Sequence, residues 1–124
     1  MSPLSILLLI KIATTGLGVA LPFLFMSKTQ LEKITNIHAS SPLFFRLYGM
    51  AILALLVGYG FGIQQSESGH FPWGVVSMGL ISNGGAAYLL LTGNSRKENK
   101  YLGIFFGLVA VALIVSVMFR TSVV

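Results

Sequence analysis

Lys11, Asn83 and Tyr59 are the side chains whose types and positions could build a polar site inside the apolar stretches of this sequence. Lys11 lies about seven residues into the first stretch, or roughly 10 Å from its outer end at ~1.5 Å of helix rise per residue. A lysine near the middle of a membrane costs about 3 kcal/mol on insertion scales, which makes it a candidate for function by default. The chemistry that its ammonium group could serve there is the binding of an anion.

Lys11 has no acidic partner within the apolar stretches. All three acidic residues lie in connections: Glu32, Glu67 and Glu98. Lys11 must therefore snorkel outward, meet polar groups of neighbouring helices, lose its proton or face an anion. We favour snorkelling by a small margin, because the four-carbon stem of lysine can cover much of the depth.

Asn83 stands near the middle of the third apolar stretch, beside Ser82. An amide without a partner is costly in hydrocarbon, so its side chain should turn inward and hydrogen-bond to another helix. We favour such a packing role over a binding role. Counting from the outer face puts Asn83 about one turn deeper than Lys11, so that Lys11, Asn83 and Tyr59 could share one pocket.

The composition is that of a membrane protein. Hydrophobic residues make up 55% of the 124 residues and charged residues 9%, whereas soluble domains carry about 25% charged residues. A soluble domain of this composition would expose large apolar patches. The absence of cysteine excludes disulfides, thiolate metal sites and cysteine nucleophiles. The formal charge of +5 comes from basic residues between the apolar stretches, which indicates membrane topology and no role in nucleic-acid binding.

Four apolar stretches, at about residues 4–26, 43–63, 71–91 and 101–119, are each near the ~20 residues that a helix needs to cross a membrane. They predict an all-α fold in which residues 1–124 form a single domain, a bundle of four transmembrane helices. We prefer an uncleaved first span to a signal peptide. No basic residue precedes this span, and Lys11 interrupts the segment that a signal peptide keeps apolar.

The connection between the first two spans has the pattern of a short helix. Ser27 followed by Gln30, and Thr29 followed by Glu32, both have capping-box spacing. Three apolar residues then recur at helical intervals: Leu31, Ile34 and Ile37. We expect a short cytoplasmic helix at the membrane interface and rank a partner-binding helix below it.

The basic residues predict the orientation. Of the eight Lys and Arg, Lys11 lies within a span and Arg120 follows the fourth span. The others lie in or beside the first and third connections: Lys28, Lys33, Arg46, Arg96, Lys97 and Lys100. The positive-inside rule therefore predicts that residues 26–45 and 92–101 are cytoplasmic, with both termini periplasmic or extracellular, in a bacterial inner membrane.

Arg46 and Tyr48 open the second span at the cytoplasmic interface. An arginine in the first turn ordinarily snorkels to phosphate and helps to set the topology, and a tyrosine suits the aromatic belt. We favour that interpretation. The alternative is a binding site for an anionic lipid headgroup.

Small residues recur at four-residue intervals in three spans. They are Ala54, Gly58 and Gly62, then Gly103 and Gly107, and finally Thr14 and Gly18. Such stripes let helix backbones approach closely. They predict tight packing, either within the four-helix bundle or between protomers.

The residues needed for metal, haem or common hydrolytic chemistry are missing from the spans. His38 and His70 fall in connections on opposite sides of the membrane by the predicted topology, and the chain has no aspartate. The two histidines therefore cannot bind one metal ion or one mid-membrane haem together. Carboxylate dyads and Ser/His/Asp triads lack their parts as well. We expect no metal and no cofactor, and we favour a non-enzymatic role over an enzymatic one.

Residues 41–49, which end in Arg46-Leu47-Tyr48-Gly49 and precede a span rich in Ala, Leu and Gly, resemble the start of the second span of small DoxX-like bacterial membrane proteins. That group consists of four-helix inner-membrane proteins of about this size, some of them tied to quinone-linked oxidoreductase complexes. The resemblance covers about one span and the number of spans. It implies the same four-helix fold and allows a role in handling quinones or lipids.

Three functions remain open. We rank first a non-catalytic protein that forms a homo-oligomer or an accessory subunit of a larger membrane complex. The second is a small transporter or channel that uses Lys11 and Asn83 to attract an anion. The third is a subunit of a membrane enzyme that handles a quinone or lipid. The lipid bilayer is the partner common to all three.

Overall fold

The computed structural model describes residues 1–35, 37–38, 40–93 and 97–124, and the side chains of residues 97–99 are left aside. Arg96 and the Lys97 side chain, which the predicted orientation counts, lie outside this description. The described residues form helices and no strand: α1 (Pro3–Thr15), the π-helical turn η1 (Gly16–Ala20), α2 (Leu21–Phe25), α3 (Lys28–Thr35), α4 (Leu43–Glu67), α5 (Trp73–Thr92), α6 (Lys97–Met118) and α7 (Arg120–Val123).

Among the described residues, four helical segments are long and apolar enough to cross a membrane: Pro3–Phe25, Leu43–Glu67, Trp73–Thr92 and Lys100–Met118. They confirm the predicted all-α bundle of four spans. The bounds differ most at the second span, where α4 continues to Glu67 although residue 63 was the predicted end. The polar residues there stay helical because Ser66 and Glu67 both bind to the start of α1.

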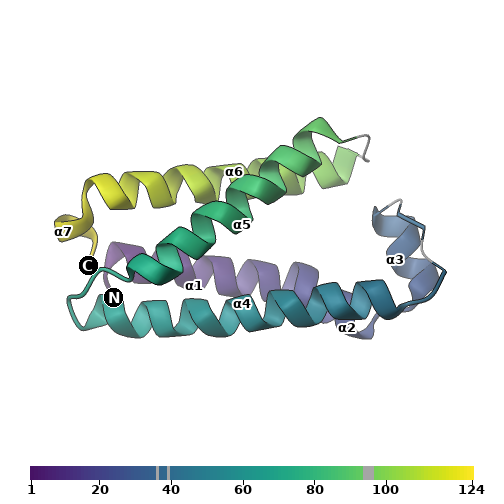
Figure 1. Cartoon of the computed structure of the whole chain (residues 1–124), viewed down its shortest axis with the longest axis horizontal. Coiled ribbons are helices and arrows are strands. Elements are labelled where there is room, and N and C mark those ends of the chain that lie inside the picture. The colour runs from purple at the N-terminus through teal and green to yellow at the C-terminus, as the bar shows by residue number, and fades with distance from the viewer. Residues whose placement is uncertain (36, 39, 94–96) are drawn as a thin grey trace.

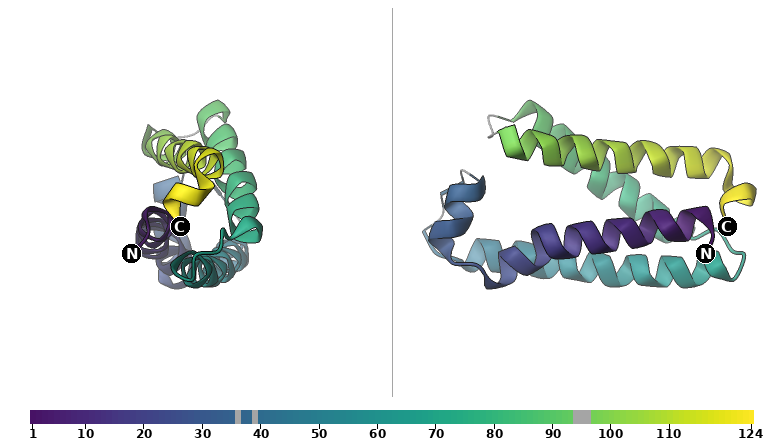
Figure 2. Two further views of the ribbon diagram at one scale, coloured as in Figure 1. Left: turned by 90° about the vertical axis from the view of Figure 1, so that its left-hand side faces the viewer. Right: turned by 180° about the vertical axis from the view of Figure 1, so that it is seen from behind.

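The spans pack as two pairs. The first span lies beside α4, and α5 lies beside α6 (Figure 1). Both termini lie at one end of the bundle, which we call the terminal end, and α3 lies at the other, which we call the α3 end. The two pairs lie close together at the terminal end and diverge toward the α3 end, and viewed end-on the four spans surround a common interior (Figure 2).

Pro22 explains the wide turn in the first span. A proline inside a helix lacks the N–H for the bond to residue i−4, and its ring clashes with that residue's carbonyl, here Gly18. The chain forms the π-helical turn Gly16–Ala20, in which the N–H of Leu21 donates to the Gly16 carbonyl. Such turns often occur at functional sites. This one begins directly after Thr15.

The apolar side chains divide between a core and an outer surface. The buried core cluster is Leu4, Leu8, Ala20, Leu56, Tyr59, Val76, Val109 and Leu113. Every span also carries exposed large apolar side chains, such as Leu17, Phe61, Ile81 and Leu108. Because all four outer faces are apolar, lipid is the solvent that suits this surface.

Two of the predicted small residues lie where helices touch most closely. A Cβ added at Gly62 of α4 would lie 2.8 Å from Val75 Cγ1 of α5 and 3.1 Å from Leu8 Cδ1 of α1. At Gly103 of α6 it would lie 2.9 Å from Leu90 Cβ of α5. Only glycine fits at these two contacts without movement of the neighbouring helix.

The remaining small residues are less tightly packed. Added Cβ atoms would lie 3.3 Å from Met78 Cε at Gly58 and 3.7 Å from Ala87 Cβ at Gly107. At Gly18 such an atom would meet nothing within 4 Å, and Ala54 is exposed. Gly18 and Ala54 therefore make no close contact within the bundle, because they face its outer surface.

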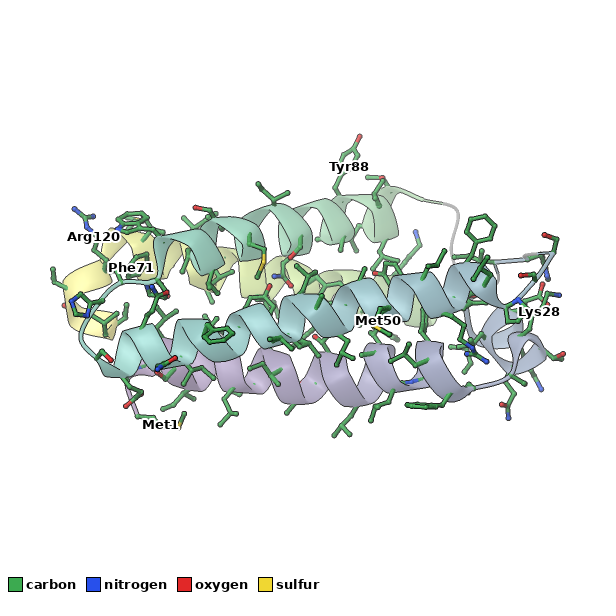
Figure 3. The ribbon with its side chains drawn as sticks, turned by 60° about the horizontal axis from the view of Figure 1, so that its bottom comes forward. Met1, Lys28, Met50, Phe71, Tyr88 and Arg120 are labelled. Atoms are coloured by element: carbon green, nitrogen blue, oxygen red, sulfur yellow. The ribbon has the colours of Figure 1, made fainter. Side chains whose placement is uncertain are left out.

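Serines join α1 to α4 at the terminal end. Ser2 caps α1, since its Oγ accepts from the Ser5 N–H at 3.1 Å, and the same hydroxyl lies 2.6 Å from Ser66 Oγ. The Ser2 N–H donates to the Glu67 carboxylate at 2.8 Å. Met1, Phe71 and Arg120 lie at this end, far from Lys28 at the other (Figure 3). These bonds fix the depth of α1 relative to α4.

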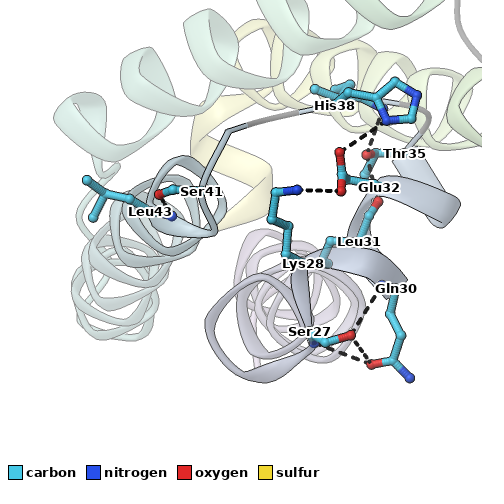
Figure 4. A network of polar contacts seen from close by, with 10 residues as sticks. Ser27, Lys28, Gln30, Leu31, Glu32, Thr35, His38, Ser41 and Leu43 are labelled. Carbon is cyan, nitrogen blue, oxygen red and sulfur yellow. Dashed lines mark hydrogen bonds and ion pairs between the residues drawn. The ribbon is translucent and has the colours of Figure 1, made fainter.

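The capping box predicted at Ser27 is confirmed. The Gln30 N–H donates to Ser27 Oγ at 3.2 Å, and Gln30 Oε1 accepts from the Ser27 N–H at 3.3 Å (Figure 4). The second possible box is absent because Thr29 lies inside α3, while Glu32 binds Lys28 at 2.9 Å and His38 at 3.1 Å. The short helix is thus confirmed, and its place at a cytoplasmic interface stays a prediction.

Candidate functional site

Lys11 points into the bundle. The residue is 5% exposed, and its Nζ lies 4.0 Å from the centre of the Phe106 ring and 5.7 Å from that of Phe105, both on α6. The part of the chain that the structure describes offers Nζ no ion pair or hydrogen bond. The favoured interpretation, in which Lys11 snorkels outward, is therefore wrong. The cation–π contacts with α6 draw its side chain inward instead.

The aromatic contact does not fully offset the cost of placing a charge at this depth. A desolvated cation–π contact contributes about 2 kcal/mol, whereas a lysine at the centre of a span costs about 3 kcal/mol on insertion scales. The charge of Lys11 is therefore only partly compensated. Its ammonium group also still has donors available for hydrogen bonds. An anionic group placed beside Nζ would supply both missing interactions.

Asn83 holds α5 to α4 and still has one atom without a partner. Its Nδ2 donates to Tyr59 Oη at 3.1 Å and to the Gly79 carbonyl at 2.8 Å. Because a carbonyl can only accept, the amide nitrogen must face Gly79, and the side chain cannot be flipped. The other atom, Oδ1, is buried and has no partner within the described part of the chain. The contacts that Asn83 makes in packing thus use only the nitrogen of its amide and leave the oxygen unused.

Thr15 is the second buried residue with an unsatisfied oxygen. Its Oγ1 has no partner, although the residue is only 3% exposed. Helical Thr and Ser commonly bind the carbonyl of residue i−4, as Thr35 does to Leu31 at 2.7 Å and Ser116 to Ala112 at 2.9 Å. Thr15 departs from this pattern at the point where the π-helical turn begins.

Tyr59 is fully buried, and Gly79 makes room for its hydroxyl. A Cβ at Gly79 would lie 3.2 Å from Tyr59 Oη. Tyr59 Oη also lies 3.5 Å from Ser82 Oγ, which in turn lies 3.5 Å from the Gly79 carbonyl. Tyr59, Ser82, Asn83 and Gly79 therefore form one polar cluster between α4 and α5.

These groups surround one cavity of about 300 Å³, which we call the central cavity. Its polar lining residues are Lys11, Thr15, Tyr48, Tyr59, Ser82 and Asn83. The rest of its wall is apolar and includes Leu55, Leu56, Leu89 and Phe106, so that all four spans contribute. The structure thus brings Lys11, Asn83 and Tyr59 to one cavity. The sequence reasoning did not find Thr15, Gly79 or Phe106.

Arg46 and Tyr48 lie near the α3 end of the bundle. Arg46 Nη1 donates to the Phe23 carbonyl at 2.7 Å, which satisfies a carbonyl in the last turn of α2. The Tyr48 ring lies 5.2 Å from the Phe23 ring, and Tyr48 also lines the central cavity. Through these contacts with Phe23, Arg46 and Tyr48 help to pack the first span against α4. Binding of a lipid headgroup by Arg46 and Tyr48 stays a prediction.

Within the described ranges, no three His, Cys, Asp or Glu side chains lie close enough to hold a metal ion. His38 binds Glu32 beside α3, whereas His70 follows α4 at the terminal end. The two histidines therefore lie at opposite ends of the bundle.

Comparison of the sequence with protein-family models gives no match, and comparisons with curated proteins and with solved structures give none either. The resemblance of residues 41–49 to DoxX-like proteins stays a prediction, as does the handling of quinones or lipids that it allows.

Proposed function

We propose that this chain is a small carrier of organic anions, which it binds at Lys11 in the middle of the membrane. The observation that carries this proposal is the burial of Lys11 against the central cavity without a carboxylate partner among the described residues. A lysine with a purely structural role in a span pairs with another group or reaches the interface. The anionic group of a ligand would be the partner that Lys11 lacks.

The size and lining of the central cavity favour an organic anion over an inorganic one. Apolar cavities of roughly 150 Å³ bind benzene, so about 300 Å³ has room for a benzene ring with substituents. An inorganic anion would exchange its hydration for the aliphatic walls formed by residues such as Leu55 and Leu89. A ligand with an apolar body and one anionic end matches both the wall and Lys11.

The arrangement of the spans supports transport in addition to binding. The central cavity draws on both helix pairs, and the pairs diverge toward the α3 end (Figure 1). Binding sites near the membrane midplane, between bundles that rock against each other, are typical of secondary transporters. In our proposal the α3 end faces the cytoplasm of a bacterial inner membrane, as the distribution of basic residues predicts.

The test uses benzenesulfonate and hexanesulfonate, which stay charged and do not cross bilayers as neutral acids. Binding is measured by calorimetry with the protein in detergent, and uptake of labelled benzenesulfonate is measured in proteoliposomes. The variant is Lys11→Met. Its matched control is Lys100→Met, which makes the same change at an exposed lysine of α6 outside the central cavity. Circular dichroism verifies that both variants are folded.

We expect saturable binding and uptake for the native protein and for Lys100→Met, with both at least tenfold weaker for Lys11→Met. Failure of both sulfonates to bind saturably would refute the proposal. Equal binding by Lys11→Met would refute it as well, because the charge would then play no part. Binding without uptake would refute the carrier role.

A homo-oligomer or accessory subunit, the function that we rank first from the sequence, is favoured by one other observation. Gly18 and Ala54 face outward, where only lipid or another chain can contact them. We propose these positions as the place to test for self-association. Gly18→Leu should convert an oligomer in mild detergent to monomer, as measured by light scattering, and a native protein that is already monomeric would contradict this idea.

A further inference from the structure

We infer that the ligand of the central cavity carries, in addition to its anionic group, a hydroxyl or N–H group that donates a hydrogen bond to Asn83 Oδ1. This inference rests on the proposed binding of organic anions and narrows the class of ligand. It depends on the contacts of Asn83 and Thr15, which are independent of Lys11.

The first step is that the amide of Asn83, a residue that lines the cavity, keeps one unused acceptor and no unused donor. Both donor bonds of its amide are used within the protein, one to Tyr59 Oη at 3.1 Å and one to the Gly79 carbonyl at 2.8 Å. Oδ1 is left buried and without a partner, in a residue that is 1% exposed and lines the cavity. Buried acceptors of this kind are rare, because nearly all buried polar atoms have a partner.

The second step is that the neighbouring hydroxyl groups are engaged with one another. Tyr59 Oη accepts from Asn83 and lies 3.5 Å from Ser82 Oγ, which lies 3.5 Å from the Gly79 carbonyl. Each of the two hydroxyl protons has an acceptor within this cluster, since Tyr59 can donate to Ser82 Oγ and Ser82 to the Gly79 carbonyl. A donor for Oδ1 must therefore come from whatever occupies the cavity.

The third step is that the cavity separates two kinds of polar group. Lys11, on α1, offers only donors and a positive charge. Asn83, on α5, offers only an acceptor, and Thr15 adds a hydroxyl without a partner. The same cavity is also lined by the apolar side chains of Leu55 and Phe106. A matching ligand has an anionic end for Lys11, an apolar ring or short chain, and a donor for Asn83.

The test compares 4-hydroxybenzenesulfonate with 4-methoxybenzenesulfonate at pH 6.5, where a phenol keeps its proton. The two probes share the ring and the anionic group, and both carry an oxygen at the same position. Only the first can donate a hydrogen bond. The 3-substituted pair is measured as well, because its oxygen lies closer to the sulfonate. Affinities are measured by calorimetry on the full chain in detergent.

We expect the hydroxy compound of at least one pair to bind tenfold or more tightly than its methoxy partner. Asn83→Leu should lower the affinity for the hydroxy compound to that for its methoxy partner. If Asn83→Leu does not fold, Tyr59→Phe provides the second variant. It removes the Tyr59 hydroxyl, leaves the bond from Asn83 to Gly79 in place, and should retain the preference.

Equal affinities within both pairs, with benzenesulfonate still bound through Lys11, would refute this inference alone and indicate that water satisfies Asn83 Oδ1. Loss of the preference in Tyr59→Phe would also refute it, because Tyr59 would then be the group that recognises the donor. Absence of binding by every sulfonate would refute the proposed function itself.

Discussion

The hydrogen bond from Asn83 Nδ2 to Tyr59 Oη, 3.1 Å long, joins the two helix pairs inside the bundle. Tyr59 belongs to α4, which packs on the first span, whereas Asn83 belongs to α5, which packs on α6. The second bond of the same Nδ2, to the Gly79 carbonyl, fixes the direction of the amide, so that Oδ1 is left without a partner among the described residues. The Asn83 amide therefore contributes to the packing of the spans and to the polarity of the central cavity.

Tyr59→Phe tests the packing role of this bond. The substitution removes the hydroxyl that accepts from Asn83 and leaves the ring in place, so the free energy of unfolding should fall by about 1 kcal/mol. The measurement is thermal or SDS-induced unfolding in detergent. Tyr88→Phe is the matched control, because Tyr88 is exposed and points away from the bundle (Figure 3). Equal stability of the two variants would contradict the role of the bond.

Gly79→Ala tests the close contact of three helices around the polar cluster. The new Cβ would lie 2.8 Å from Leu113 Cδ1 and 3.2 Å from Tyr59 Oη, so we expect a loss of about 1–3 kcal/mol from overpacking. Gly84→Ala, on the same helix, would meet nothing within 4 Å and should be neutral or stabilise the protein by up to about 1 kcal/mol. Unfolding in detergent measures both. A stable Gly79→Ala protein would show that the contact is loose.

Arg46→Gln should destabilise the first span. The guanidinium group donates to the Phe23 carbonyl at 2.7 Å, and a charged hydrogen bond of this kind contributes about 1.5–3 kcal/mol. Lys28→Gln removes one positive charge from the same connection but breaks only a partly exposed pair with Glu32, worth about 0.5 kcal/mol or less. Detergent unfolding should separate the two variants by about 1 kcal/mol or more, and a smaller loss in Arg46→Gln than in Lys28→Gln would refute this assignment.

The predicted orientation can be tested directly because the chain has no cysteine. Single cysteines at His70 and Ser122 should react with a membrane-impermeant maleimide added to intact cells, and a cysteine at Thr29 should react only after the membrane is opened. All three native residues are exposed. Reaction of only the cysteine at position 29 in intact cells would indicate the opposite orientation. Equal reaction of all three cysteines would indicate dual topology.

Patterns that lie within one segment were predictable from the sequence. The spans follow from hydropathy and length, and the capping box of Ser27 and Gln30 follows from a spacing of three residues. Part of the polar cluster could have been found in the same way, because Gly79 stands four residues before Asn83, where a helical side chain can bind the carbonyl. The predicted packing role of Asn83 places its hydrogen bonds on other helices and does not include the bond to Gly79 within α5.

The direction of the Lys11 side chain could not be predicted in this way. Snorkelling and burial differ by rotations about the side-chain bonds of one lysine, and the choice depends on the Phe106 ring on α6. The unsatisfied oxygen of Thr15 has a similar origin. It depends on the π-helical turn that Pro22 induces, and the sequence does not show where along the helix the wider turn will form.

Lys11→Met should make the empty protein more stable and at the same time abolish ligand stabilisation. Burial of the charge costs about 3 kcal/mol and the Phe106 contact returns about 2 kcal/mol, so the substitution should add about 1 kcal/mol to the free energy of unfolding. Benzenesulfonate at a hundred times its Kd should stabilise the native protein by about 2.7 kcal/mol and leave Lys11→Met unchanged. Unfolding curves should therefore rank the variant above the native protein without ligand and below it with ligand, while Lys100→Met follows the native protein in both conditions. If Lys11→Met were less stable than the native protein without ligand, Lys11 would stabilise the packing of the empty protein. Its burial would then need no bound anion to explain it.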